Sequence, residues 1–138
     1  MTSLIFSAKK LLRIEEVQAE SKFFKKVDDH LSHLPNSWFT NIQQVTINGT
    51  PDRLGCVAGK FVALEGKRSP KEKPTPLQKY NIERINIAGG YADVIHPENW
   101  AGIHDRLQKL ATITDKDLEI QVLKNEIRTL RAIIRLNT

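Results

Sequence analysis

Residues 52–67 read DRLGCVAGKFVALEGK, and this stretch decides how the middle of the chain folds. Two short apolar runs, 53–57 and 60–64, flank the pair Ala58-Gly59. This arrangement is typical of a β-hairpin whose two strands are joined by a two-residue turn. The sequence therefore predicts a pair of antiparallel strands at the centre of a sheet.

The register of this hairpin brings two acids and one lysine together. With two central turn residues, Asp52 lies opposite Glu65, and Lys67 points to the same face of its strand as Glu65. Directly opposed carboxylates repel one another, and a divalent cation between them removes the conflict. Alanine fits the first position of a type I′ turn poorly, so a bulge at Gly59 stays open as an alternative. It would shift the pairing by one residue and make the acids diagonal neighbours.

On both sides of the hairpin, helical and strand patterns alternate along the chain. The further predicted elements are a helix over 9–34, in one or two pieces, a strand over 38–47, a helix over 75–88 capped by Thr75, a strand over 91–95 and a helix over 97–110. This order predicts an α/β domain over residues 1–112, with a mixed central sheet flanked by helices.

Residues 113–138 are expected to form a separate C-terminal coiled-coil helix. Thr114 to Asp117 matches a capping box. An apolar stripe at alternating spacings of three and four follows it, formed by Ile120, Leu123, Ile127, Leu130 and Ile134. Ile at positions a and Leu at positions d favour a parallel dimer, in which Glu119 faces Lys124 and Glu126 faces Arg131 of the partner chain. We expect a homodimer or a higher homo-oligomer; the alternative is a helix that packs this stripe on its own domain.

Composition narrows the classes of function. The chain has 138 residues, 21 Lys and Arg against 16 Asp and Glu, and a formal net charge of +5, which fits a polyanionic partner. Cys56 is the single cysteine, expected to be a small buried residue, and an internal disulfide is excluded. No stretch approaches the roughly 18 apolar residues of a membrane helix, so we expect a cytoplasmic protein in a reducing compartment. Zinc-finger, helix-turn-helix, aromatic RNA-binding and P-loop signatures do not occur.

Five features in order resemble the PD-(D/E)XK nuclease superfamily, and above all its small phage-type VRR-NUC members. The central ones are Gly49-Thr50-Pro51-Asp52 and the segment 59–67, GKFVALEGK. The outer ones are Glu20-Ser21 in the first helix, Thr75 to Gln78, and Gly89-Gly90 before the last strand. The likeness covers about residues 20–100. It implies a restriction-endonuclease-like fold, and it is compatible with a phage-encoded enzyme that acts in the host cytoplasm.

The resemblance also implies roles for the hairpin residues. Asp52 and Glu65 would bind one or two Mg²⁺ or Mn²⁺ ions, with the Gly66 carbonyl as a further ligand. Lys67 would position the attacking hydroxide and stabilise the charge that develops on the phosphate. Gly66 departs from the family, which usually carries an apolar residue there. We expect it on the opposite face from the acids, where it affects packing more than chemistry.

Two helix residues are further candidates. Glu20 falls in the apolar stripe of the first helix, where a carboxylate needs a partner. The metal cluster is one such partner, and a solvated position at the edge of the stripe is the alternative. Gln78 shares a face with Ile82 and Ile85, and similar nucleases have a Gln near the site. Because Thr75 to Gln78 also reads as a capping box, a purely structural role stays open.

Basic side chains surround the hairpin and the loop after it: Lys60, Arg68, Lys71, Lys73 and Lys79. We expect them to contact DNA phosphates without reading base sequence. The sequence therefore predicts a Mg²⁺-dependent endonuclease, a dimer selective for branched DNA such as a four-way junction. One alternative is a sequence-specific homing or restriction-type endonuclease. Another is a non-catalytic DNA-binding or assembly protein whose main feature is the coiled coil.

Overall fold

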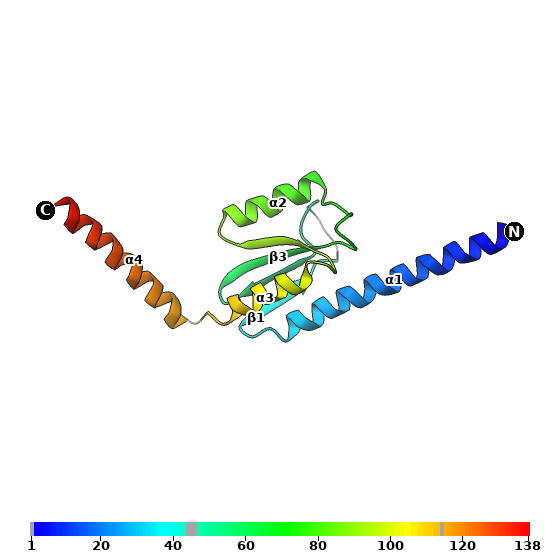
Figure 1. Cartoon of the computed structure of the whole chain (residues 1–138), viewed down its shortest axis with the longest axis horizontal. Helices are drawn as coiled ribbons and strands as arrows, with labels where there is room; N and C mark the ends of the chain where they lie inside the picture. Colours follow the sequence, from blue (N-terminus) through cyan, green and yellow to red (C-terminus); the bar gives the residue numbers. More distant parts are fainter. Residues whose placement is uncertain (1, 44–46, 114) are drawn as a thin grey trace.

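The computed structural model describes residues 2–43, 47–113 and 115–138 (Figure 1). Its elements in chain order are α1 (Thr2–Ser32), β1 (Ser37–Asn41), β2 (Arg53–Val57), β3 (Lys60–Gly66), α2 (Pro76–Ile87), β4 (Tyr91–Ile95), α3 (Trp100–Ala111) and α4 (Asp115–Leu136). The strands form one mixed sheet in the order β1-β2-β3-β4, antiparallel except for the parallel pair β3–β4. The predicted α/β class, with a mixed sheet flanked by helices, is confirmed.

The central hairpin has the predicted register. Val57 pairs with Lys60 and Arg53 with Leu64. Ala58 and Gly59 have φ values of +47° and +81°, so both lie in the left-handed region that a type I′ turn requires. The bulge at Gly59 does not occur, and the alanine adopts the turn conformation despite its Cβ atom.

The two faces of the sheet are covered differently. α1 and α3 lie on one face and α2 on the other (Figure 1). The core lies under α1 and α3, and is formed by Phe23, Val27, Leu31, Leu34, Val57, Val62, Leu64, Tyr91, Ile95, Trp100, Ile103, Leu107 and Ala111. α2 has no buried residue. Polar contacts help to attach it, such as the Asn81 Nδ2 bond to the Gly49 carbonyl at 2.9 Å.

Several predicted boundaries need correction. The first helix is one continuous element that begins at Thr2, and the last helix of the domain begins at Trp100 rather than Pro97. The strand predicted over 38–47 ends at Asn41; residues 44–46 lie outside the described part of the chain, as does Thr114 of the C-terminal capping box. Cys56 is exposed, not buried, because it alternates with the core-facing residues of β2.

Both ends of the chain extend away from the sheet (Figure 1). The described side chains of α1 between residues 4 and 19 are all exposed, and no residue of α4 is buried. The apolar stripe of α4 is therefore not packed on its own domain. Among the described residues, no helix combines the length and the apolar character needed to cross a membrane.

Candidate active site

Glu65 is a buried carboxylate near the end of β3, on the face that α2 covers. The residue is only 6% exposed, and Oε1 accepts a hydrogen bond from Gln78 Nε2 at 3.0 Å. Lys67 Nζ lies 3.7 Å from the same oxygen. The second oxygen, Oε2, is buried without a hydrogen-bond partner. A buried acceptor in this state is costly, so the site offers an open position to a proton or a cation.

The surroundings of Glu65 oppose its ionisation. The pKa of Glu65 is raised to about 7, first by burial and then by the negative charge of Asp52, while the positive charge of Lys67 acts in the opposite direction. A carboxyl group with this pKa is partly protonated at neutral pH. The effect of Asp52 also means that the two acids lie close enough to repel one another, as the hairpin register predicts.

Gln78 connects the two buried charged groups and caps α2 at the same time. Its Oε1 accepts a hydrogen bond from Lys67 Nζ at 3.1 Å and another from the Thr75 amide at 2.9 Å. The backbone N–H of Gln78 donates in return to Thr75 Oγ1 at 3.2 Å, which completes the capping box. Gln78 therefore caps α2 and contacts Glu65 and Lys67 at the same time, so the start of α2 is fixed to these two residues.

Asp52 lies in a bend just before β2, and its carboxylate turns toward the α1 side. Oδ1 accepts hydrogen bonds from the Gly66 amide at 3.2 Å and from Arg53 Nη1 at 3.1 Å. A Cβ atom on Gly66 would lie 3.2 Å from Asp52 Oδ2 and 2.5 Å from the Phe24 ring. The expectation that Gly66 lies opposite both acids is thus wrong for Asp52, because Arg53 and the Gly66 amide draw this carboxylate to the Gly66 side. It holds for Glu65, which faces α2.

Arg53 is a buried cation that the sequence analysis missed. It is 6% exposed, and its guanidinium bonds Asp28 on α1 through Nε at 2.7 Å and Nη2 at 3.3 Å. The available signal was its position two residues before Gly55 and four before Val57, on the core-facing side of the predicted hairpin. A charged residue on that side needs a buried partner.

Glu20 has a different partner from the one considered for it. Its carboxylate forms an ion pair with Arg68 Nε at 3.3 Å, and its side chain is 31% exposed. In the described part of the chain, no three or more His, Cys, Asp or Glu side chains form a group that could hold a metal ion. The structure therefore does not bring Glu20 into a cluster with Asp52 and Glu65.

The predicted phosphate contacts are only partly gathered at the site. Arg68, Lys71 and Lys73 are exposed in the loop after Lys67, and Lys79 is exposed on the first turns of α2. Lys60 lies beside the turn at the other end of β3, about 20 Å from Lys67 at the usual rise of a strand. Lys60 therefore does not belong to the basic surface next to Glu65.

The carboxylates fit a hard divalent cation in one specific respect. The unpartnered Glu65 Oε2 needs a positive partner, and the charge of Asp52, whose side chain is 39% exposed, acts on the Glu65 carboxyl group. Two protein carboxylates are enough for Mg²⁺, which usually keeps several waters and substrate oxygens as its other ligands.

No family model, curated protein sequence or solved structure matches this chain. Inference about its function therefore depends on the chemistry of these residues.

Proposed function

We propose that the protein is a Mg²⁺- or Mn²⁺-dependent endonuclease that hydrolyses phosphodiester bonds in DNA. The observation that carries the proposal is the buried Glu65, whose Oε2 has no hydrogen-bond partner, with the ammonium of Lys67 3.7 Å from its Oε1 and the negative charge of Asp52 acting on it. A module that only binds or assembles has no need of two repelling acids at the end of a hairpin. Perturbed ionisable groups of this kind are typical of catalytic sites.

Each residue of the site has a role in this proposal. Asp52 and Glu65 would hold the cation, with the Gly66 carbonyl as a further ligand. When bound, the ion would activate a water molecule and neutralise charge on the phosphate. Lys67, held by Gln78 at 3.1 Å, would present its ammonium to the scissile phosphate. The exposed Arg68, Lys71, Lys73 and Lys79 would contact neighbouring phosphates, which adds affinity without base specificity.

The proposal extends to a homodimer that acts on branched DNA. The apolar stripe of α4 is exposed, and the charges beside it are complementary between two parallel copies. A two-fold dimer would carry two candidate sites, which suits paired cuts in a four-way junction.

The test compares three substrates with Mg²⁺ or with EDTA: supercoiled plasmid, linear duplex and a four-way junction. We expect Mg²⁺-dependent cutting, fastest on the junction, that falls by about 100-fold or more in Asp52→Asn and Glu65→Gln. Asp29→Asn, which neutralises an exposed acid on α1, is the matched control and should cut normally. A single dominant cut on linear plasmid would favour a sequence-specific endonuclease. No cutting with Mg²⁺ or Mn²⁺ would leave the assembly role.

A further inference from the structure

We propose that Asp28 and Arg53 are positioning residues for Asp52, and that they set the affinity of the candidate site for its divalent cation. The inference rests on the proposed function, and it gives the C-terminal part of α1 a role in the candidate site, through Arg53.

Arg53 joins two acids from different elements with one planar group. Nε and Nη2 bond both oxygens of Asp28 at 2.7 and 3.3 Å, and Nη1 bonds Asp52 Oδ1 at 3.1 Å. The guanidinium lies over the ring of Phe24, 5.0 Å from its centroid. The planar guanidinium has several donors in fixed directions, so it can hold two carboxylates at once. The ammonium of a lysine is a compact charge without this geometry.

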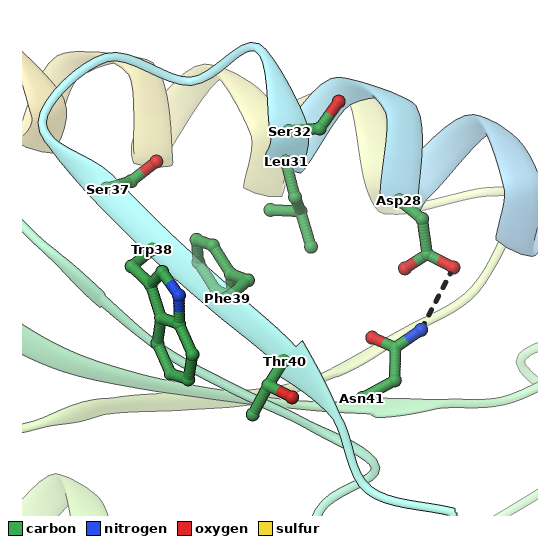
Figure 2. Close-up of a pocket in the computed structure, with 8 residues that line it drawn as sticks. All are labelled: Asp28, Leu31, Ser32, Ser37, Trp38, Phe39, Thr40 and Asn41. Carbon is green, nitrogen blue, oxygen red and sulfur yellow. Dashed lines mark hydrogen bonds between the residues drawn. The ribbon is translucent and has the colours of Figure 1, made fainter.

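Arg53 forms more hydrogen bonds with Asp28 than with Asp52. Asp28 receives two of the three bonds, whereas Asp52 receives one, and the shortest of the three goes to Asp28. Asn41 on β1 also donates to Asp28 Oδ2 at 3.3 Å and fixes this carboxylate from the other side of a groove of about 500 Å³ (Figure 2). Asp28 therefore prevents the arginine from closing on Asp52 with two parallel bonds.

The result is an Asp52 carboxylate that is oriented but still available. The Gly66 amide holds it from the β3 side, 3.2 Å from Oδ1 and 3.3 Å from Oδ2, and no Arg53 nitrogen bonds Oδ2. A ligand held in this way keeps lone pairs for a metal ion. Residues that orient metal ligands typically change metal affinity by about 10–100-fold when they are replaced.

Asp28→Asn should weaken cation binding for two reasons that act in the same direction. It removes a negative charge near the site, and it frees Arg53 to form a bidentate pair with Asp52, which then competes with the ion. Asp29→Asn is the matched control: it makes the same change in charge one residue further along α1, on an exposed side chain that does not bond Arg53.

The experiment measures Mn²⁺ binding to the full chain by electron paramagnetic resonance, well below the unfolding temperature. We expect the Kd of Asp28→Asn to rise at least 10-fold over wild type, that of Asp29→Asn to stay within about 2-fold, and Asp28→Glu to recover part of the loss. If Asp28→Asn does not fold, Arg53→Lys takes its place with the same expected rise, because an ammonium cannot hold both acids.

Two outcomes would overturn the inference, and they are distinguishable. If the folded variants bind Mn²⁺ as wild type does and only unfold more easily, Asp28 and Arg53 have a purely structural role while the metal site stands. If wild-type protein binds no Mn²⁺, and Asp52→Asn and Glu65→Gln behave identically to it, the proposed function fails as well.

Discussion

Glu65 is a residue whose ionisation the fold opposes, and its pKa near 7 gives a prediction for stability. The group holds its proton more tightly in the folded protein than in the unfolded chain, where its pKa is 4.5. The free energy of unfolding should therefore fall as pH rises from about 4.5 to 7, by an amount on the order of 3 kcal/mol. Below this window the penalty is absent. Glu65→Gln should be more stable than wild type at pH 8 and similar to it at pH 4.5, as measured by urea unfolding in EDTA.

Glu83→Gln on the exposed face of α2 is the control for this measurement. It removes a carboxylate of the same type without burial, so its stability should follow wild type at both pH values. If the gap between Glu65→Gln and wild type were the same at pH 4.5 and pH 8, a raised pKa could not be its cause.

Gly66 gives a second prediction at this scale, because its lack of a side chain is a steric requirement. A Cβ atom would lie 2.5 Å from Phe24 Cε1 and 3.2 Å from Asp52 Oδ2. Gly66→Ala should lower the free energy of unfolding by about 1–3 kcal/mol, the usual effect of overpacking. Gly102→Ala is the matched control in α3, where a Cβ meets nothing within 4 Å. It should raise stability by about 0.5–1 kcal/mol, since alanine favours helix. Equal effects in the two variants would contradict the steric argument.

At the scale of elements, the turn of the central hairpin holds Ala58 in a strained backbone conformation that another type of residue would adopt more easily. Ala58 has φ of +47°, a conformation that costs an L-residue with a Cβ roughly 1 kcal/mol. Ala58→Asn creates Asn-Gly, the favoured pair for a type I′ turn, and should stabilise the protein by up to about 1 kcal/mol in urea unfolding. Ala58→Val should do the opposite, because a β-branched residue is strongly disfavoured there. Destabilisation by both substitutions would mean that the turn tolerates alanine for another reason.

Elements with strong local signals could be predicted from the sequence. The hairpin register follows from two strands and a two-residue turn, and the start of α2 follows from the Thr75 capping box. Both depend on residues close together in the chain. The same local reasoning predicts Asp52 near Glu65 and Lys67. In the structure Lys67 Nζ lies 3.7 Å from Glu65 Oε1, and the charge of Asp52 contributes to the raised pKa of Glu65.

The remainder of the site depends on partners that are distant in the sequence. The Asp52 carboxylate turns toward α1 because Arg53 is held by Asp28, 25 positions earlier. Glu20 pairs with Arg68 across an even larger separation. No periodicity or spacing encodes which long side chain reaches which acid, so neither orientation could be read from the pattern.

At the scale of the whole molecule, the described part of the chain leaves two helical segments without a packing partner. The exposed large apolar residues of α1 include Leu4, Ile5, Phe6, Leu11, Leu12, Ile14 and Val17. Those of the α4 stripe, Ile120, Leu123, Ile127, Leu130 and Ile134, are between 42% and 62% exposed. Exposed apolar surface on this scale marks interaction sites. The α4 stripe, unlike α1, has a heptad order, and in the proposed dimer a second copy of the same helix would cover it.

Charge exchange on α4 tests that assignment. In a parallel dimer Glu126 of one chain faces Arg131 of the other, so Arg131→Glu should place like charges together and weaken the dimer. Glu126→Lys combined with Arg131→Glu restores opposite charges and should recover the dimer. Sedimentation at low ionic strength measures both, because salt screens such exposed pairs.

Arg128→Glu makes the same change in charge at position b, away from the partner, and should leave the dimer nearly as stable as wild type. Equal losses in Arg128→Glu and Arg131→Glu, without recovery in the double variant, would point to net charge and exclude the parallel register. A wild-type chain that sediments as a monomer at micromolar concentration would remove the dimer itself, and with it the reason to expect paired cuts in branched DNA.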